Sequence, residues 1–124
     1  MRDILSEIKS IIPTIQEVKS PVKIGYAPEG KKACIYIYFV PGDDAKYHFG
    51  RQEKTISKPK VCIKVRHPEY AQGYIEAEAI KKRFSAGKVD DTFGMFLDGD
   101  INYLGYEENE CPEFELNYKT IIVN

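Results

Sequence analysis

The chain contains no tryptophan, three cysteines and no apolar run longer than Ala33–Val40. That run is far too short to cross a bilayer, and the N-terminal residues mix charges where a signal peptide is continuously apolar. Cys34, Cys62 and Cys111 form no CxxC pair, so they predict neither a disulfide framework nor a zinc knuckle. These shortages predict a protein that stays in the reducing cytoplasm of the cell that makes it, without a membrane partner.

Signatures of catalysis are lacking as well. The sequence contains neither a GxGxxG nor a Walker A loop, so no nucleotide site is predicted. His48 and His67 lack the spacing of a metal-binding pair, and Cys111 has no neighbouring base that would activate its thiol. We interpret both histidines as exposed or capping residues and expect no catalytic residue, no cofactor and no enzyme activity.

One segment has the spacing that opens a calcium-binding loop, with Asp98, Asp100 and Asn102. The pattern then fails, because Tyr103 and Asn109 occupy the positions where such a loop needs glycine and glutamate. The segment is therefore interpreted as a β-turn, and no metal site is predicted.

The formal net charge is −1, which argues against a dedicated nucleic-acid-binding protein, but the charges are unevenly spread. Residues 1–87 carry 16 Lys and Arg against 10 Asp and Glu, whereas residues 88–124 carry 2 against 9. One interpretation is that both blocks are solvated strand faces and loops. The other is that a basic surface of one copy meets an acidic surface of the next, in a head-to-tail contact that closes into a ring or grows into a filament.

Two helices are predicted. The apolar residues of Ile4–Ile12 recur at the spacing of one helical face, and Pro13 ends or kinks this helix. A second helix follows Pro68, because the apolar positions of Tyr70–Phe84 recur at helical spacing. Gly87 is expected to adopt the left-handed conformation that follows a helix.

The strands are expected to begin with Val22–Tyr26, an edge strand joined in a hairpin to Ala33–Val40. The second of these lacks polar alternation and is expected to be a central strand covered on both faces. Three further strands are predicted at Thr92–Leu97, Ile101–Tyr106 and Glu113–Val123.

A strand that alternates strictly between apolar and polar residues is predicted from Lys60 to Arg66. It carries two opposite sets of side chains, an apolar set expected to face the core (Val61, Ile63 and Val65) and a basic set (Lys60, Cys62, Lys64 and Arg66). Before it, residues 41–58 are polar and punctuated by glycine. Segments of this length usually carry function or lack order, so we expect a long loop or extended hairpin that serves as a contact arm.

Together these elements predict a single α+β domain over residues 1–124. Its sheet is expected to be mainly antiparallel or mixed, with both helices packed on one side. The nine tyrosines suit either a core with hydrogen-bonded hydroxyl groups or an interface.

Several segments resemble a known family. The block Pro59–His67 and the helix Ile75–Phe84 resemble the strand ending in arginine and the alanine-rich helix of small tail terminator, or tail-completion, proteins and related minor capsid proteins of tailed bacteriophages. Leu104–Glu110 followed by Phe114–Tyr118 is similar to the closing pattern of that family, a leucine-glycine step, an acidic turn and a final strand. The similarity covers about residues 33–123.

The resemblance implies a hexameric ring of α+β subunits that caps the tail tube, stops its polymerisation and presents a surface to the head connector. Its expected partners are other copies of the chain, the tail-tube protein and a sheath or head–tail connector protein. Its expected location is the cytoplasm of the bacterial host during assembly, and then the tail of a virion or of a headless, phage-tail-like bacteriocin. The sequence departs from the family at Glu110-Cys111-Pro112, where a glycine-arginine pair is common.

A function of another class stays open, because the basic face of the strand from Lys60 to Arg66, near aromatic residues, is typical of a small nucleic-acid- or ligand-binding module. The assembly hypothesis instead assigns interfaces to charged residues of the arm, the basic face and the acidic turn. These candidates are Arg51, Lys54, Lys58, Lys60, Lys64, Arg66, Glu107, Glu108 and Glu110.

Overall fold

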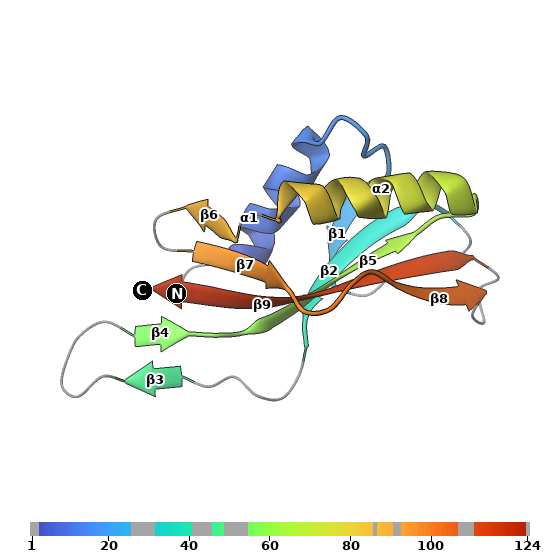
Figure 1. Cartoon of the computed structure of the whole chain (residues 1–124). Coiled ribbons are helices and arrows are strands. Elements are labelled where there is room, and N and C mark those ends of the chain that lie inside the picture. The colour runs from blue at the N-terminus through green and yellow to red at the C-terminus, as the bar shows by residue number, and fades with distance from the viewer. Residues whose placement is uncertain are drawn as a thin grey trace.

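A computed structural model describes the chain at residues 3–25, 32–40, 46–48, 55–85, 87–90, 93–106 and 111–123. Within these residues, nine strands form one mixed sheet, and two α-helices cover one of its faces (Figure 1). The predicted α+β class is confirmed. None of the helices in this part of the chain is both long and apolar enough to span a membrane.

The first helix, α1 (Ile4–Ile11), begins after Asp3, whose carboxylate accepts hydrogen bonds from the hydroxyl and the backbone amide of Ser6. These bonds favour the ionised carboxylate and lower the pKa of Asp3. A 3₁₀ turn (Ile12–Thr14) follows, because Pro13 has no N–H to continue the helix. The predicted helix and its end are thus confirmed. Its buried face consists of Ile4, Leu5, Ile8 and Ile12.

The next two strands, β1 (Val22–Ile24) and β2 (Cys34–Phe39), pair in parallel, so the predicted hairpin is wrong. A hydrogen bond of 2.8 Å from the amide of Gly25 to the carbonyl of Ile37 extends this pairing. A parallel pairing requires the chain to run back past β1 before β2 begins. Because β1 has only three residues, the connecting residues 25–33 are enough for this. Turn-forming residues in the sequence do not distinguish such a return from a tight hairpin.

The middle of the sheet is formed by β5 (Lys60–Arg66) and the last strand, β9 (Pro112–Val123). β5 lies between β2 and β9 and is antiparallel to both. The side chains of β5 that were predicted to face inward, Val61, Ile63 and Val65, are buried in the core. Phe114, Leu116, Tyr118 and Ile122 of β9 are buried with them. β2 is buried on both faces from Cys34 to Ile37, as its lack of polar alternation predicts.

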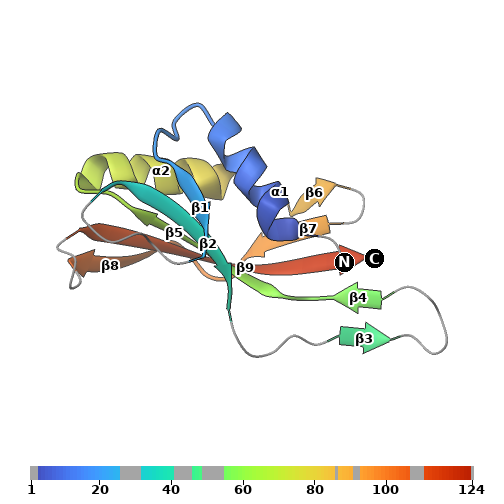
Figure 2. The same ribbon diagram turned by 180° about the vertical axis from the view of Figure 1, so that it is seen from behind.

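Two short strands, β3 (Lys46–His48) and β4 (Thr55–Ser57), pair antiparallel within the segment predicted as an arm. β4 keeps the register of β5 against β9, and Pro59 interrupts the ladder because it has no N–H to donate. The carbonyl of Pro59 still accepts a hydrogen bond of 3.1 Å from the amide of Thr120. Of the two predicted forms, loop or extended hairpin, the described residues show a hairpin at one end of the sheet (Figure 2).

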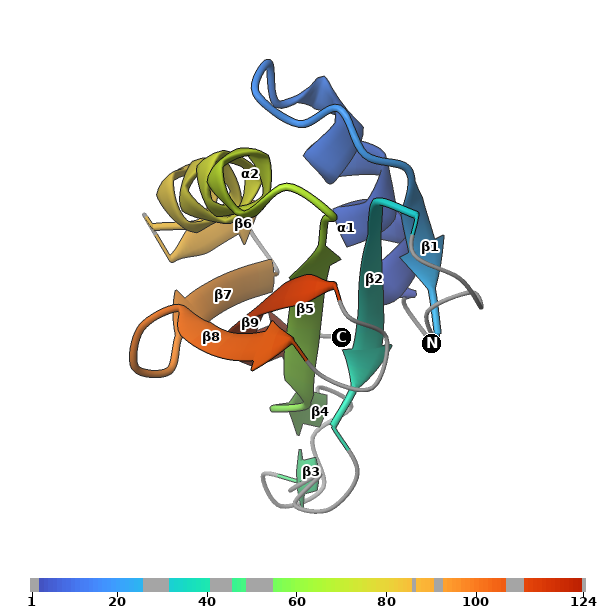
Figure 3. The ribbon, with the colours of Figure 1, turned by 90° about the vertical axis from the view of Figure 1, so that its right-hand side faces the viewer.

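The second helix, α2 (Tyr70–Arg83), lies against β5 and β9, while α1 lies against β1 and β2 on the same side of the sheet (Figure 3). Gly73 permits this close approach, since a Cβ atom there would lie 3.0 Å from the ring of Phe114. The left-handed conformation predicted for Gly87 is confirmed, with a φ of 82°. Its predicted role as the cap of the helix is wrong, because α2 ends at Arg83 and Phe84 is the cap residue.

Three strands follow α2, namely β6 (Lys88–Asp90), β7 (Phe93–Leu97) and β8 (Asn102–Tyr106). β7 and β8 match the predicted ranges to within one residue, whereas β6 is not predicted. β8 and β7 pair with one edge of β9, near its start and its end respectively, and β5 and β4 pair with the other edge. The 12-residue strand β9 is therefore the long axis of the sheet, about 36 Å from end to end.

Candidate assembly surfaces

The basic face predicted for β5 is mostly covered. Arg66 is 1% exposed, and its Nε donates a hydrogen bond of 3.2 Å to the carbonyl of Lys32. Its register neighbours, Cys34 and Glu113, are buried too. Glu113 accepts hydrogen bonds from the hydroxyl of Tyr36, whose pKa is raised by burial and by this carboxylate. Arg66 and its neighbours on β2 and β9 are covered on this face as well, so the open basic face that alternation predicts is not formed at Arg66.

The positive charge of Lys64 is stabilised by groups of the same chain. Its Nζ lies 3.8 Å from Oε2 of Glu115, and 6.0 and 5.8 Å from the ring centres of Tyr36 and Tyr38. A carboxylate and the faces of two aromatic rings both stabilise an ammonium group in such a position. Of the three cations predicted on this face, Lys60 alone has an exposed side chain. The surface on which the nucleic-acid hypothesis depends is therefore reduced to one residue.

The two carboxylates of the calcium-like pattern face lysines. Asp100 Oδ1 lies 2.8 Å from Nζ of Lys81, and Asp98 Oδ1 lies 3.9 Å from Nζ of Lys119. The hydrogen bond with Lys81 lowers the pKa of Asp100 and raises that of Lys81. Gly99, between the two aspartates, has a φ of 91°, as the predicted turn requires. Part of the acidic C-terminal block is thus paired within the chain.

Of the remaining candidates, two lie in the described part of the chain. Lys58 and Lys60 are exposed where β4 joins β5. The others lie outside the described residues, namely Arg51, Lys54, Glu107, Glu108 and Glu110. The strands that flank them are described. β3 and β4 flank Arg51 and Lys54 in the sequence, and β4 pairs with β9 at Val123. β8 precedes the acidic turn and pairs with Pro112, at the other end of β9.

These strands mark opposite ends of the molecule, as Figure 1 shows. The length of β9, about 36 Å, is several times the Debye length of about 8 Å at physiological ionic strength. Charged groups that are separated by the full length of β9 therefore do not neutralise each other.

A cluster of tyrosines lies where α2 meets β8, at the same end as the start of β9. Tyr70 stacks on Tyr74 at 6.3 Å between ring centres and meets Tyr103 edge to face at 5.1 Å. All three rings lie within 6.1 Å of the ring of Phe114, which is buried. The tyrosines themselves are 47%, 44% and 45% exposed. The sequence interpretation missed this cluster, because it assigned Tyr70 to the buried helix face and had no signal that brings α2 beside β8.

The outward side of α2 borders a groove of about 890 Å³, which lies between this helix and residues 14–17. Ile15 and Ile75 line the groove, and Ile75 is 47% exposed. The inward side of the helix is also apolar, with Ala77 and Ile80 fully buried. The groove is therefore a mixed surface, because Glu78, Lys82 and Arg83 line it beside the two isoleucines.

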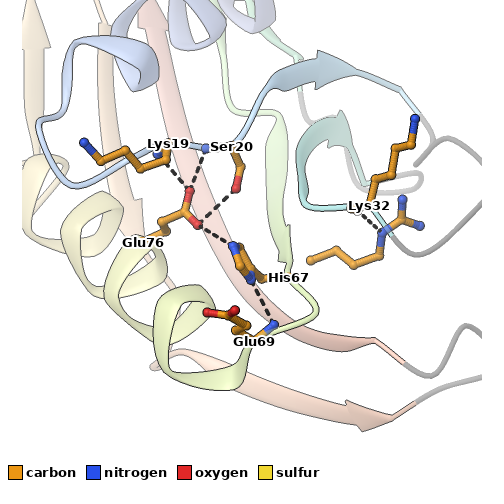
Figure 4. A network of polar contacts seen from close by, with 7 residues as sticks. Lys19, Ser20, Lys32, His67, Glu69 and Glu76 are labelled. Atoms are coloured by element: carbon orange, nitrogen blue, oxygen red, sulfur yellow. Dashed lines mark hydrogen bonds and ion pairs between the residues drawn. The ribbon is translucent and has the colours of Figure 1, made fainter.

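A buried carboxylate fixes α2 to the segment that follows α1 (Figure 4). Glu76 is fully buried and accepts hydrogen bonds from the amides of Lys19 and Ser20, at 3.1 and 2.9 Å, and from the Ser20 hydroxyl at 3.0 Å. His67 accepts a hydrogen bond from the amide of Glu69 through Nδ1, at 3.0 Å, and its Nε2 lies 3.9 Å from Glu76 Oε2. With three donors satisfied on one carboxylate, the network positions the helix.

Comparison with known proteins gives two matches. A family described as "Bacteriophage tail terminator protein" matches residues 9–124. A solved chain described as "Virion of native gene transfer agent (GTA) particle" is similar in fold, with a TM-score of 0.56 and 10% sequence identity over 99% of this chain and 100% of that chain. At this identity the likeness concerns the fold alone. No curated protein sequence matches this chain.

Proposed function

The chain belongs to the bacteriophage tail terminator family, and on that basis we propose that copies of it close into a homohexameric ring that caps a tail tube. The ring stops polymerisation of the tube and joins it to the head connector or collar. The observation that carries this proposal is the family match, which takes in residues 9–124. The broader role, that of a structural protein of a phage tail, follows from family membership itself.

The separation of charge along β9 supports a head-to-tail contact between copies. A ring needs two different surfaces on each subunit, one for each neighbour. In this proposal, the basic surface consists of Lys58 and Lys60 with the neighbouring arm residues Arg51 and Lys54. The acidic surface is the turn that carries Glu107, Glu108 and Glu110. The strands that flank these two sets lie at opposite ends of a strand about 36 Å long.

Lys64 and Arg66 have a different role in this proposal. Lys64 is engaged by Glu115 and by two tyrosine rings, and Arg66 is buried. They stabilise the subunit and its sheet and do not contact a neighbour. No observation in the described part of the chain favours the alternative of a nucleic-acid-binding module.

The partners beyond other copies of the chain are the tail-tube protein and, at the opposite face of the ring, a head–tail connector or sheath protein. Assembly takes place in the cytoplasm of the bacterial host, after which the ring is part of a virion or of a headless, phage-tail-like particle. The fold of a chain from a gene transfer agent virion, similar over nearly the full length, supports a place in such a particle.

The proposal is tested by imaging the purified protein with and without tail-tube protein. Native mass spectrometry is expected to detect a closed oligomer, and negative-stain images are expected to show rings and tubes capped at one end. A protein that stays monomeric at all concentrations and leaves tube ends bare contradicts the proposal.

A further inference from the structure

We propose that the arm, residues 41–58, is hinged to the sheet and turns away from β9 of its own subunit when copies assemble. The hinge consists of the two places where the arm joins the sheet, at Val40 and at Pro59. The inference rests on the proposed function, because it concerns the segment to which part of the basic contact surface is assigned. It adds the movement by which this segment becomes available to a neighbouring copy.

The arm is attached to β9 by few backbone pairs. β4 pairs with β9 at two positions, Ile56 with Val123 and Ser57 with Ile122, whereas β5 pairs with the same edge of β9 at seven positions. Pairs between neighbouring strands are the unit of sheet stability, so a ladder of two pairs opens more readily than a ladder of seven. The arm is therefore the part of this edge that separates first.

Within the arm, β3 and β4 are joined to each other more extensively than to the sheet. Three pairs connect them, from Lys46 with Ser57 to His48 with Thr55. Among the residues that the structure describes, β3 pairs with β4 and with no other strand. The two strands form a hairpin that lies beside the end of β9, as Figure 2 shows, and we expect them to leave β9 together.

The chain leaves the arm at Pro59, which is buried. The strand register against β9 is interrupted between Ser57 and Lys60, because Pro59 has no N–H to donate. Its carbonyl is nevertheless held by two donors of Thr120, the amide at 3.1 Å and the hydroxyl at 2.6 Å. Thr120 is 1% exposed, so water does not compete for these bonds. Pro59 is therefore fixed to the sheet at the point where the register breaks.

The chain enters the arm next to the point where it leaves. The amide of Val40, which follows β2, donates a hydrogen bond of 2.9 Å to the carbonyl of Lys60. Val40 and Pro59 are thus held side by side, and two such points define an axis about which the hairpin can turn. On the other side of this axis, the paired residues Val61 and Tyr118 are buried in the core. The movement therefore leaves the core unchanged.

The movement gives the arm a reach that it lacks while β4 lies on β9. Thr55, at the far end of β4, is four residues from Pro59, so it lies about 13 Å from the axis. Turning about the axis displaces this end by a similar distance, away from the subunit to which it belongs. A neighbouring copy that binds only the displaced arm shifts the population toward it, at the expense of the two pairs with β9.

Two disulfides test the movement. The lock variant carries Ile56→Cys and Val123→Cys, which face each other across β4 and β9, so its disulfide ties the arm to its own sheet. The control variant carries Lys46→Cys and Ser57→Cys, which face each other across β3 and β4, so its disulfide closes the hairpin and leaves the hinge free. The three native cysteines are buried, and oxidised wild type measures any disulfide that they form.

Native mass spectrometry with and without reductant measures assembly, after thermal melting has shown that both variants are folded. The oxidised lock variant is expected to assemble about tenfold more weakly than its reduced form, or weaker still. Addition of reductant is expected to restore the oligomer of wild type. The control variant is expected to assemble as wild type does under both conditions, because its disulfide does not cross the hinge.

Hydrogen exchange of dilute, unassembled protein tests the hinge without any ring. The amides that join β4 to β9 are expected to exchange at least about tenfold faster than those that join β5 to β9. Thr120→Val removes the hydroxyl bond to Pro59 at nearly constant volume and is expected to speed exchange in β4 further. Thr120→Ser keeps the hydroxyl and is expected to have the smaller effect.

Three results overturn the inference or part of it. An oxidised lock variant that forms rings as readily as its reduced form shows that the arm stays on its own sheet, and it leaves the proposed function intact. Equal exchange rates in β4 and β5 remove the hinge. A wild-type protein that forms no ring removes the proposed function and the link between hinge and assembly, and hydrogen exchange then decides the hinge alone.

Discussion

The amide of Ser20 donates a hydrogen bond of 2.9 Å to Oε1 of Glu76, joining residues 56 positions apart in the sequence. The carboxylate belongs to α2, and the amide belongs to the segment between α1 and β1. The bond therefore fixes the second helix to the first part of the chain on the covered face of the sheet.

Replacing Glu76 by alanine is expected to lower the free energy of unfolding by about 3 kcal/mol, because three buried donors lose their acceptor. Glu76→Gln keeps one acceptor oxygen and is expected to lose less. Urea denaturation measures both. The control is Glu78→Ala on the more exposed side of the same helix, expected to change stability by about 0.5 kcal/mol or less. Equal losses at the two positions contradict a special role of Glu76.

Gly87→Ala is expected to destabilise the fold by about 2–3 kcal/mol. The φ of 82° disfavours alanine, and a Cβ atom would lie 2.7 Å from the ring of Phe96. Gly99→Ala is the matched control, because Gly99 has a φ of 91° and no atom within 4 Å of the added Cβ. Its expected loss is about 1 kcal/mol. Adding Phe96→Ala to the Gly87→Ala variant is expected to recover part of the difference, and no recovery contradicts the clash.

Ile37→Lys is expected to prevent folding or to cost more than about 4 kcal/mol, because the side chain is fully buried and an ammonium group finds no partner there. The same substitution at Ile75, which is 47% exposed, is expected to change the free energy of unfolding by about 0.5 kcal/mol or less. Circular dichroism and thermal melting compare the two. A large loss at Ile75 shows that its contacts on α2 belong to the core.

The ion pair of Asp100 and Lys81 is expected to make stability depend on pH in the acidic range. Because the hydrogen bond with Lys81 lowers the pKa of Asp100 below its ordinary value of 3.8, the pair stabilises the fold above that value. The contribution is lost as the pH falls through the lowered pKa. The melting temperature of wild type is therefore expected to exceed that of Asp100→Asn slightly at neutral pH, and the two are expected to converge in strongly acidic buffer.

Lys81→Gln provides the control for this pH effect. It is expected to give the same small loss as Asp100→Asn, and the double variant is expected to lose no more than either single one. Losses that add up in the double variant contradict the pairing.

Shortening residues 43–57 is expected to leave folding nearly intact and to weaken assembly. In the described residues, the arm joins the rest of the sheet through β4, which pairs with β9 at two positions. Thermal melting and native mass spectrometry of the shortened chain measure the two effects. A collapse of thermal stability instead shows that the arm belongs to the core.

The sequence predicted the local elements well, because their signals are local. The apolar spacing of Ile4–Ile12 and the effect of Pro13 gave the first helix and its end. The alternation in Lys60–Arg66 gave the inward side chains of β5. Glycine at position 87 gave the left-handed residue after α2. The resemblance over about residues 33–123 led to the family that the comparison confirms.

The sequence did not give the pairing of strands or the exposure of the predicted sites. The direction of β1 relative to β2 depends on the path between them, and turn residues do not specify it. The burial of Arg66 depends on the strands beside it. Alternation shows on which face of the sheet a side chain lies, but it does not show whether that face is covered. The exposure of the charged candidate residues could therefore be learned only from the tertiary structure.

What the sequence determined by itself is the class of the fold, the extent of most helices and strands, and the uneven charge of the two halves of the chain. Hydrophobic periodicity and backbone chemistry act between near neighbours, so they can be read without a structure. Only the tertiary structure decided that Tyr70, Tyr74 and Tyr103 form one surface, and that the strands flanking the basic and acidic segments lie at opposite ends of β9. These relationships join residues from distant parts of the chain, and they exist only once the sheet is paired.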